Sequence, residues 1–127
     1  MDKKPSKVYV IDDDESVRRA FGRLLRSASL DAETFSSAEE FLSSAKQDKN
    51  ACILIDIRMP GLSGFDLQEK LTSEGIRIPV IAISAHDDEE TREHARELGA
   101  VSFYRKPVDD QALLDAIWWA IARSRKE

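Results

Sequence analysis

The stretch Cys52-Ile53-Leu54-Ile55, which leads directly into Asp56, is an unbroken apolar run near the middle of the 127-residue chain. Similar runs occupy residues 8–11, 80–83 and 101–104, with the sequences Val-Tyr-Val-Ile, Val-Ile-Ala-Ile and Val-Ser-Phe-Tyr. Short runs of this composition are typical of strands that are buried on both faces of a parallel sheet. Residues 31–35 form a weaker strand candidate, and their polarity and short length favour the edge of the sheet.

Five helical patterns alternate with these runs, at about residues 14–28, 37–45, 63–71, 87–98 and 109–125. Asp14 and Ser37 are predicted N-caps, Ser37 with the capping-box spacing to Glu40, and Gly99 is predicted to end the fourth helix, whose apolar stripe is thin. Strict alternation of strands and helices implies one parallel α/β sheet with right-handed crossovers and helices on both faces. The apolar residues expected on the helix stripes are Val17, Ala20, Phe21, Leu24, Leu25, Ala28, Phe41, Leu42, Ala45, Phe65, Leu67, Leu71, Leu113, Leu114, Ala116, Ile117, Ala120 and Ile121.

The composition argues against several classes of protein. The chain is 42% hydrophobic and 34% charged, and its 19 basic and 24 acidic residues give a net charge of −5. This acidic balance argues against a surface that binds nucleic acid or an anionic membrane. No apolar segment has the length of a signal peptide or a membrane span. Cys52, the single cysteine, is expected to be a small buried apolar residue, and we expect one cytoplasmic domain over residues 1–127.

Polar residues capable of chemistry follow the apolar runs, where parallel strands bring their carboxyl ends to one edge of the sheet. They are Asp12, Asp13, Asp56, Ser84 and Lys106. Each also fits a structural role alone, since acidic residues cap helices and Lys-Pro is a common loop pair. Together, however, three carboxylates on one edge repel one another unless a cation lies between them.

Mg²⁺ is the cation that suits these residues, because it prefers carboxylate oxygens, waters and phosphate oxygens. A zinc site is disfavoured, since His86 and His94 form no ligand pair with the cysteine. A carboxylate beside Mg²⁺, a hydroxyl and an ammonium group can accept a phosphoryl group. The residues therefore predict Asp56 as the nucleophile, with Ser84 and Lys106 neutralising the phosphoryl oxygens.

Four stretches carry a family resemblance: Val10-Ile11-Asp12-Asp13, Asp-Ile-Arg-Met-Pro-Gly-Leu-Ser-Gly at residues 56–64, Ile83-Ser84-Ala85 and Lys106-Pro107. On these motifs the chain resembles the receiver domain of two-component response regulators over nearly its whole length. The Asp-x-Arg-Met-Pro-Gly stretch and the Arg-Lys-Pro-Val-Asp sequence of residues 105–109 most resemble the FixJ-type subfamily. The resemblance implies a flavodoxin-like (βα)5 fold, a doubly wound parallel five-stranded sheet of order 2-1-3-4-5.

The resemblance also implies a metal site. Asp12 and Asp13 correspond to the acidic pair that binds Mg²⁺, for which Mn²⁺ can substitute. Asp56 corresponds to the phosphoacceptor and a further metal ligand, and the backbone carbonyl of Arg58 is expected to complete the protein ligands.

A second group of residues corresponds to the parts that respond to the phosphoryl group. Ser84 and Lys106 occupy the positions of the hydroxyl and the lysine that contact the phosphoryl oxygens. Phe103, three residues before Lys106, corresponds to the aromatic switch that turns inward with Ser84, and a plain core aromatic is the alternative. His86 is interpreted either as a residue that steers the hydrolytic water or as an ordinary loop residue.

The implied function is a phosphorylation-dependent switch. A sensor histidine kinase is expected to phosphorylate Asp56, and the chain is expected to catalyse only its own phosphorylation and dephosphorylation rather than to act as an enzyme. Phosphorylation is expected to strengthen a homodimer through the fourth helix, the fifth strand and the fifth helix. The output is expected to be transcription, although no output domain, nucleic-acid contact or membrane contact is expected within residues 1–127.

Three other functions fit part of this pattern. A haloacid-dehalogenase-like phosphatase also uses an aspartyl phosphate, but its Asp-x-Asp motif is broken here by Arg58. A flavodoxin is disfavoured because the acidic loop at residues 12–15 would repel the flavin phosphate. A receiver that acts without phosphorylation is the third.

Trp118 and Trp119 point about 100° apart on a helix, so they cannot both face one core. An exposed tryptophan there would suit a partner surface unless neighbouring side chains cover it.

Overall fold

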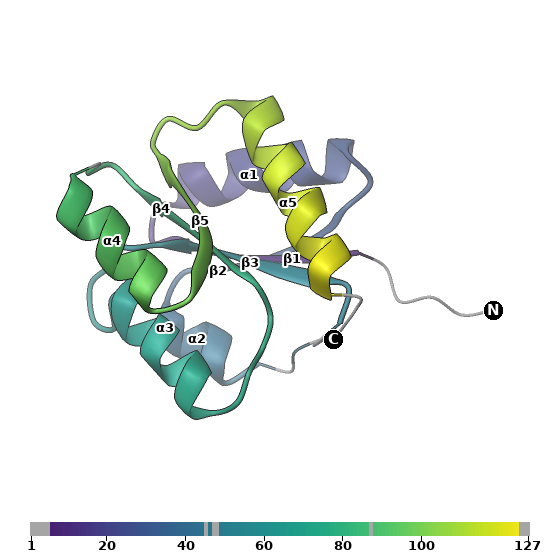
Figure 1. Ribbon diagram of the computed structural model, residues 1–127. Helices are drawn as coiled ribbons and strands as arrows, with labels where there is room; N and C mark the ends of the chain where they lie inside the picture. The colour runs from purple at the N-terminus through teal and green to yellow at the C-terminus, as the bar shows by residue number, and fades with distance from the viewer. Residues whose placement is uncertain (1–5, 45, 47–48, 87, 125–127) are drawn as a thin grey trace.

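A five-stranded parallel sheet with the strand order β2-β1-β3-β4-β5 forms the centre of the molecule (Figure 1). The computed structural model describes residues 6–44, 46, 49–86 and 88–124. The strand order and the alternation of strands with helices confirm the predicted fold. The strands are β1 (Lys7–Ile11), β2 (Asp31–Phe35), β3 (Ala51–Asp56), β4 (Val80–Ser84) and β5 (Ala100–Arg105), and the helices are α1 (Glu15–Ser27), α2 (Ala38–Leu42), α3 (Gly64–Ser73), α4 (Glu89–Glu97) and α5 (Asp110–Ser124).

Helices cover both faces of the sheet. Figure 1 shows α1 and α5 on one face and α2 and α3 on the other, with α4 beside α3. Alternate residues of the central strands therefore enter different cores: Val8 and Leu54 pack in the cluster with α1 and α5, whereas Tyr9 and Ile53 pack in the cluster with α2 and α3. This two-sided burial explains why the central strands are apolar at successive positions.

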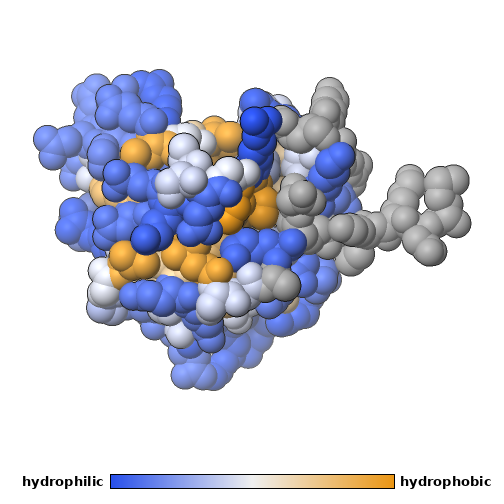
Figure 2. Space-filling view, turned by 90° about the horizontal axis from the view of Figure 1, so that it is seen from below, coloured by the Kyte–Doolittle hydropathy of each residue, from blue (hydrophilic) through white to orange (hydrophobic). Residues whose placement is uncertain are grey.

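The surface on the side of α2 and α3 is mostly hydrophilic, with small apolar patches between charged side chains (Figure 2). β2 lies at the edge of the sheet and exposes Asp31 and Thr34, as its polarity predicts. The described residues contain no helix with the length and apolar character that a membrane span requires. Cys52 is buried in β3, as predicted, and burial raises the pKa of its thiol to about 12.

α2 is shorter than predicted. It ends at Leu42, and the predicted Ala45 lies outside the described residues. The hydroxyls of Ser43 and Ser44 donate to carbonyls of the preceding turn, which satisfies the end of the helix locally. Ser37 caps the helix as predicted, but the carboxylate of Glu40 accepts from the backbone N–H of Ser36, so the reciprocal capping box is not formed.

The other helices follow the prediction with small differences. α4 begins at Glu89 after its N-cap Asp88, and both the predicted start at Asp87 and the predicted end of the fifth helix at Arg125 lie outside the described residues. Ala20 was expected on the apolar stripe of α1 but is exposed. Gly22 is buried instead, because the stripe that packs on the sheet is rotated away from Ala20.

Local backbone features fix the end of α4, where Gly99 was predicted, and the start of α3. Gly99 follows α4 with a φ of +105°, the left-handed region in which glycine is favoured. Ser63 caps α3 and forms a complete capping box with Asp66. Gly64 begins this helix at very close range to β3, since a Cβ there would lie 2.6 Å from the Asp56 carbonyl oxygen and 2.7 Å from the Ile57 Cα.

Candidate functional site

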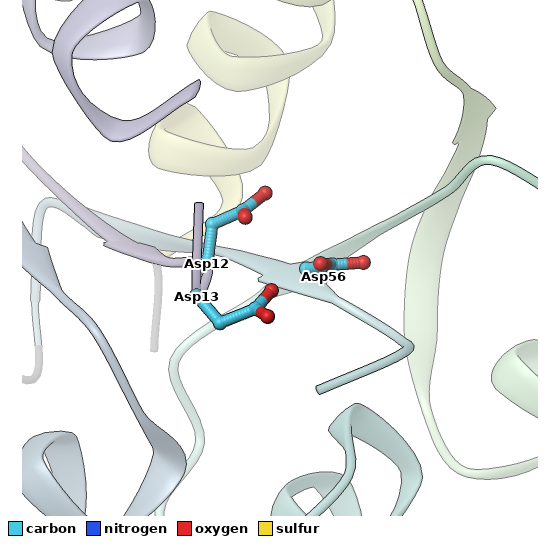
Figure 3. Close-up of side chains that lie close together, drawn as sticks. All are labelled: Asp12, Asp13 and Asp56. Atoms are coloured by element: carbon cyan, nitrogen blue, oxygen red, sulfur yellow. The ribbon is translucent and has the colours of Figure 1, made fainter. Parts of the chain in front are cut away.

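Three carboxylates meet at the carboxyl edge of the sheet, at the point where the strand order reverses between β1 and β3 (Figure 3). Asp12 and Asp13 follow β1, and Asp56 is the last residue of β3. One ligand atom from each of the three lies within 4.8 Å of the others. Asp12 and Asp56 are buried, whereas Asp13 is exposed at the mouth of the cluster.

Asp12 is held through all of its polar atoms. Its backbone N–H donates to the Phe35 carbonyl at 3.1 Å. Its Oδ1 accepts from the Asp14 N–H at 2.9 Å, and its Oδ2 accepts from Lys106 Nζ at 2.8 Å. Its carbonyl oxygen accepts from Arg18 Nη1 at 2.8 Å. The loop that presents the acidic residues is therefore fixed from β2, α1 and the end of β5.

Lys106 connects the carboxylates of two strands. Besides Asp12, its Nζ lies 3.5 Å from Asp56 Oδ2. Its backbone N–H donates to the Ser84 carbonyl at 2.8 Å, which fixes the end of β5 to the end of β4. Burial lowers the pKa of Lys106, but the hydrogen bonds and charges of Asp12 and Asp56 outweigh this effect and raise it above the ordinary value. Lys106 is thus a firmly protonated cation within the acidic cluster.

The carboxyl group of Asp56 is strongly perturbed by its surroundings. Burial, followed by the charge of Asp12, raises its pKa to about 6, although Lys106 and the N–H of Arg58 act in the opposite direction. The Arg58 N–H donates to Asp56 Oδ1 at 3.2 Å. One lysine therefore does not balance the three carboxylates, and the oxygen donors fit a hard divalent cation such as Mg²⁺.

Ser84 and Arg58 both lie close to Asp56 but differ in exposure: Arg58 follows it by two residues in the chain, and Ser84 follows Ile83, which pairs with Asp56 in the sheet. Ser84, the last residue of β4, is fully buried, and its Oγ accepts from the His86 N–H at 3.0 Å. The side chain of Arg58 is exposed in the loop after β3, as are Ala85 and His86 in the loop after β4. These three exposed residues therefore line the approach to the site rather than its interior.

Phe103 lies on the α4 side of β5. It is half-buried against the cluster formed by Ile57, Ala82 and Ala95, and the guanidinium of Arg92 lies 5.6 Å from its ring centroid. Phe103 pairs with Ala82 in β4, and Ala82 lies two residues before Ser84. β5, which carries Phe103, is therefore the strand next to the Ser84 hydroxyl. Tyr104 points to the opposite core, as the alternation predicts.

Sequence reasoning missed Arg18, which holds the Asp12 carbonyl from the second turn of α1. An arginine on the polar side of a helix has the same pattern as a solvated surface residue. The only available signal was its position six residues after an acidic residue at a strand end.

A comparison with known families decides what these features belong to. The family model described as the response regulator receiver domain matches residues 8–118. The chain belongs to the response regulator receiver family. This assignment supports neither the phosphatase nor the flavodoxin interpretation.

Several regulators and solved receivers are similar to this receiver. Nodulation protein W of Bradyrhizobium diazoefficiens is 44% identical over 119 residues, which cover 94% of this chain and 52% of the relative. The transcriptional regulatory protein FixJ of Azorhizobium caulinodans is 38% identical over 120 residues, 94% of this chain and 57% of the relative. The chain therefore spans about half the length of these curated relatives.

The structural comparison agrees with the sequence comparison. The crystal structure of FixJ-N has a TM-score of 0.86 and 33% identity, and the match covers 94% of this chain and 96% of that chain. The response regulator StyR has a TM-score of 0.89 and 41% identity, with 97% of this chain and 62% of that chain covered. The FixJ-type resemblance predicted from the motifs is thereby confirmed.

Proposed function

We propose that this receiver accepts a phosphoryl group on Asp56 from the phosphohistidine of a sensor histidine kinase. The observation that carries the proposal is the meeting of three carboxylates from two strands with one lysine at the switch point of the sheet. Such an arrangement is unfavourable on its own, because the negative charges outnumber the positive charge. It becomes favourable when a cation and a phosphoryl group occupy the same edge.

The proposed reaction has two steps, and each step forms one bond to phosphorus and breaks another. A carboxylate oxygen of Asp56 attacks the phosphorus atom, and the bond between phosphorus and the donor imidazole nitrogen breaks, leaving its electron pair on that nitrogen. In the second step, a water oxygen bonds to the phosphorus atom, the bond between phosphorus and the Asp56 oxygen breaks, and inorganic phosphate leaves the restored carboxylate while the water proton passes to solvent. The chain acts as a switch on itself, and no external substrate is turned over.

The metal ligands are assigned on the chemistry of their oxygen atoms. Asp12, Asp13 and Asp56 would hold Mg²⁺, or Mn²⁺ as a substitute, together with the backbone carbonyl of Arg58. When bound, the ion neutralises the charge that develops on the phosphoryl oxygens. Lys106 contributes a second positive charge, and it must shift from Asp12 toward Asp56 to do so, since its distances are 2.8 Å and 3.5 Å.

The new charge on Asp56 is expected to reposition Ser84 and Phe103. The Ser84 hydroxyl can donate to a phosphoryl oxygen, and movement of β4 at this position alters the space beside Phe103. Phosphorylation would then shift the population between two arrangements of α4 and β5. In this proposal Phe103 and Ser84 form the switch.

The proposed readout is a homodimer formed through α4, β5 and α5, with transcription as the output of the regulator. Trp118 and Trp119 of α5 are 39% and 50% exposed, and the Arg123 guanidinium covers the ring of Trp119 at 4.7 Å. Exposed tryptophans are enriched in protein interfaces, so α5 suits a protein partner. The net negative charge of the chain supports the proposal that residues 1–127 contact neither nucleic acid nor an anionic membrane.

Intact mass spectrometry tests the proposal directly. The protein is incubated with Mg²⁺ and acetyl phosphate, and Asp56→Asn is compared with Asp115→Asn, which removes an exposed carboxylate of α5. One phosphoryl group is expected on the wild type and on Asp115→Asn, and none on Asp56→Asn. If the wild type stays unmodified while a control receiver reacts, the acidic edge serves only to bind a cation or a partner, and the phosphorylation-independent alternative is correct.

A further inference from the structure

Gln68 is a buried amide between two helices. It lies in α3 with 2% of its surface exposed, and its Nε2 donates to the backbone carbonyl of Ala95 in α4 at 3.0 Å. Within the described residues, its Oε1 is buried and has no hydrogen-bond partner. Burial of an unpartnered amide oxygen is unfavourable, so the side chain is not explained by core packing alone.

The acceptor of this bond is an end-of-helix carbonyl that needs a donor. In α1, the Leu30 N–H closes the last turn by donating to the Leu25 carbonyl at 3.0 Å. In α3, the Ile76 N–H does the same for the Leu71 carbonyl at 2.9 Å. These are the long hydrogen bonds that satisfy a helix C-terminus whose next residue is left-handed.

α4 ends differently. Its Gly99 N–H donates to the Arg96 carbonyl at 2.9 Å, as in the corresponding turns of α1 and α3. The carbonyl that remains is that of Ala95, and among the described residues its donor is the Gln68 side chain rather than a backbone N–H. Ala100 is already the first residue of β5, where the ladder to β4 is irregular at Val80, so the chain leaves the helix before its turn is closed.

α3 is also rigidly attached to the phosphoacceptor strand. The Gly64 N–H, at the start of α3, donates to the Ile57 carbonyl at 2.9 Å. The Gly64 Cα is so close to the Asp56 carbonyl that no Cβ fits between them. Gln68 follows one helical turn later, so a continuous chain of contacts runs from Asp56 through α3 to the end of α4.

We propose that Gln68 is a positioning residue that ties the C-terminal turn of α4 to α3, and that the response of α4 to a charge on Asp56 depends on this bond. α4 buries only Thr91 and Ala95, so a single buried hydrogen bond has a large influence on its position. The second half of the proposal rests on the phosphorylation of Asp56 proposed above. The first half concerns the unmodified protein and is tested separately.

Amide hydrogen exchange of Gln68→Met tests both halves. Methionine preserves the length of the side chain but donates no hydrogen bond, and Glu69→Met places the same side chain at the neighbouring exposed position of α3 as a control. The amides of Leu98 and Gly99 are expected to exchange roughly fivefold faster in Gln68→Met, the equivalent of one ordinary hydrogen bond. The exchange rates of the β3 and β4 amides are expected to be unchanged. The substitution also removes the unpartnered Oε1, and this gain offsets the loss of the hydrogen bond in the free energy of global unfolding. Gln68→Leu repeats the test with a second apolar side chain if Gln68→Met does not fold.

The response to modification is measured on the same variants with Mg²⁺ and beryllium fluoride, a mimic of the phosphoryl group. The change in α4 exchange is expected to be smaller in Gln68→Met than in the wild type and Glu69→Met. Equal exchange in Gln68→Met and Glu69→Met, or acceleration spread evenly over β3, β4 and α4, would overturn the role of Gln68. Failure of the wild type to accept a phosphoryl group from acetyl phosphate would overturn the proposed function, while the exchange of the unmodified variants would still decide the tie between α3 and α4.

Discussion

Asp12 and Asp56 have unequal shares of the Lys106 charge. The shorter bond goes to Asp12, which is also held by Asp14 and by Arg18, whereas Asp56 has only the longer contact and one backbone N–H. The residue proposed to react is therefore the least neutralised buried carboxylate of the pair. Burial and, after it, the charge of Asp12 raise the pKa of Asp56 to about 6, and the longer contact with Lys106 offsets them only in part.

We predict that Asp56→Asn stabilises the protein at pH 7 in the presence of a chelator. The folded pKa of Asp56 is about 6, above the unfolded value of 3.8, so the folded state binds the proton more tightly. Stability therefore falls as the pH rises from about 4 to about 6, and ionised Asp56 costs at most about 3 kcal/mol at pH 7. Asparagine avoids this cost, because it carries no charge at any pH in this range.

Urea unfolding at pH 7 and at pH 4.5 measures the effect. The gain from Asp56→Asn is expected to be largest at pH 7 and to shrink at pH 4.5, where the wild-type carboxyl is mostly protonated when folded. Asp115→Asn is the control, since that carboxylate is exposed. An equal gain at both pH values would show that ionisation of Asp56 is not the cause.

Residues at strand ends could be predicted from sequence, and residues that reach across elements could not. Asp12, Asp13, Asp56 and Lys106 meet because parallel strands place their ends on one edge, which depends only on the order of elements. Arg18 and Gln68 act through long side chains directed at backbone carbonyls of another element. Nothing in their local pattern distinguishes the first from a surface arginine or the second from an exposed polar residue of a helix.

At the scale of the elements, local hydrogen bonding decided most of the differences from the prediction. The strands and the five helices lie where hydrophobic periodicity places them. The serines after Leu42 end α2 early, because their hydroxyls donate to carbonyls of the preceding turn. The capping box is absent because the Glu40 carboxylate accepts from the N–H of Ser36 rather than from that of Ser37. These outcomes depend on rotamers, which the spacing of residue types does not specify.

Gly64→Ala is predicted to destabilise the receiver by about 1–3 kcal/mol. The new Cβ would lie less than 3 Å from the backbone of Asp56 and Ile57, which cannot move aside without displacing β3. Gly22→Ala is the matched control within α1, since the three atoms nearest to its Cβ all belong to the flexible end of Arg26, the closest at 3.1 Å. Chemical unfolding of both variants checks the prediction, and a loss in Gly22→Ala equal to that in Gly64→Ala would contradict it.

Phe103→Ala is predicted to separate phosphorylation from dimer formation. The variant keeps every carboxylate, Ser84 and Lys106, so acetyl phosphate should still modify it. It loses the ring that fills the space between β5 and α4, and the gain in dimer on phosphorylation should therefore weaken. Size-exclusion chromatography and intact mass on the same samples give both quantities, and an unchanged gain in dimer would refute the switch role.

At the scale of the whole molecule, the order of the strands creates the site. β1 and β3 are neighbours at the centre of the sheet, and their connections leave in opposite directions, so the space above their ends stays open to solvent. The residues that fill this space are acidic, and the fold gathers their charges without a full set of counter-charges. The energy of the folded state is therefore sensitive to any cation that enters.

Mg²⁺ is predicted to raise the melting temperature of the receiver. At a concentration about 100 times its Kd, the ion would stabilise the folded chain by about 3 kcal/mol, or roughly 10 °C for a domain of this size. Thermal unfolding with increasing Mg²⁺ measures this shift. Asp13→Asn should reduce the shift strongly, because it removes one of the three carboxylates of the cluster, and the exposed position of Asp13 lets the fold tolerate the change. A shift of the same size in Asp13→Asn and the wild type would remove Asp13 from the proposed ligands.

The burial of Cys52 gives the molecule an intrinsic reporter of its own opening. The chain has one cysteine, and this residue lies in the central strand with a thiol pKa of about 12. Alkylating reagents react with the thiolate, so they leave the closed molecule untouched and modify only molecules in which the middle of the sheet has come apart. The rate of alkylation under native conditions therefore counts these rare events, and it does so in the wild-type chain, without a label and with one chemical event for each molecule that opens.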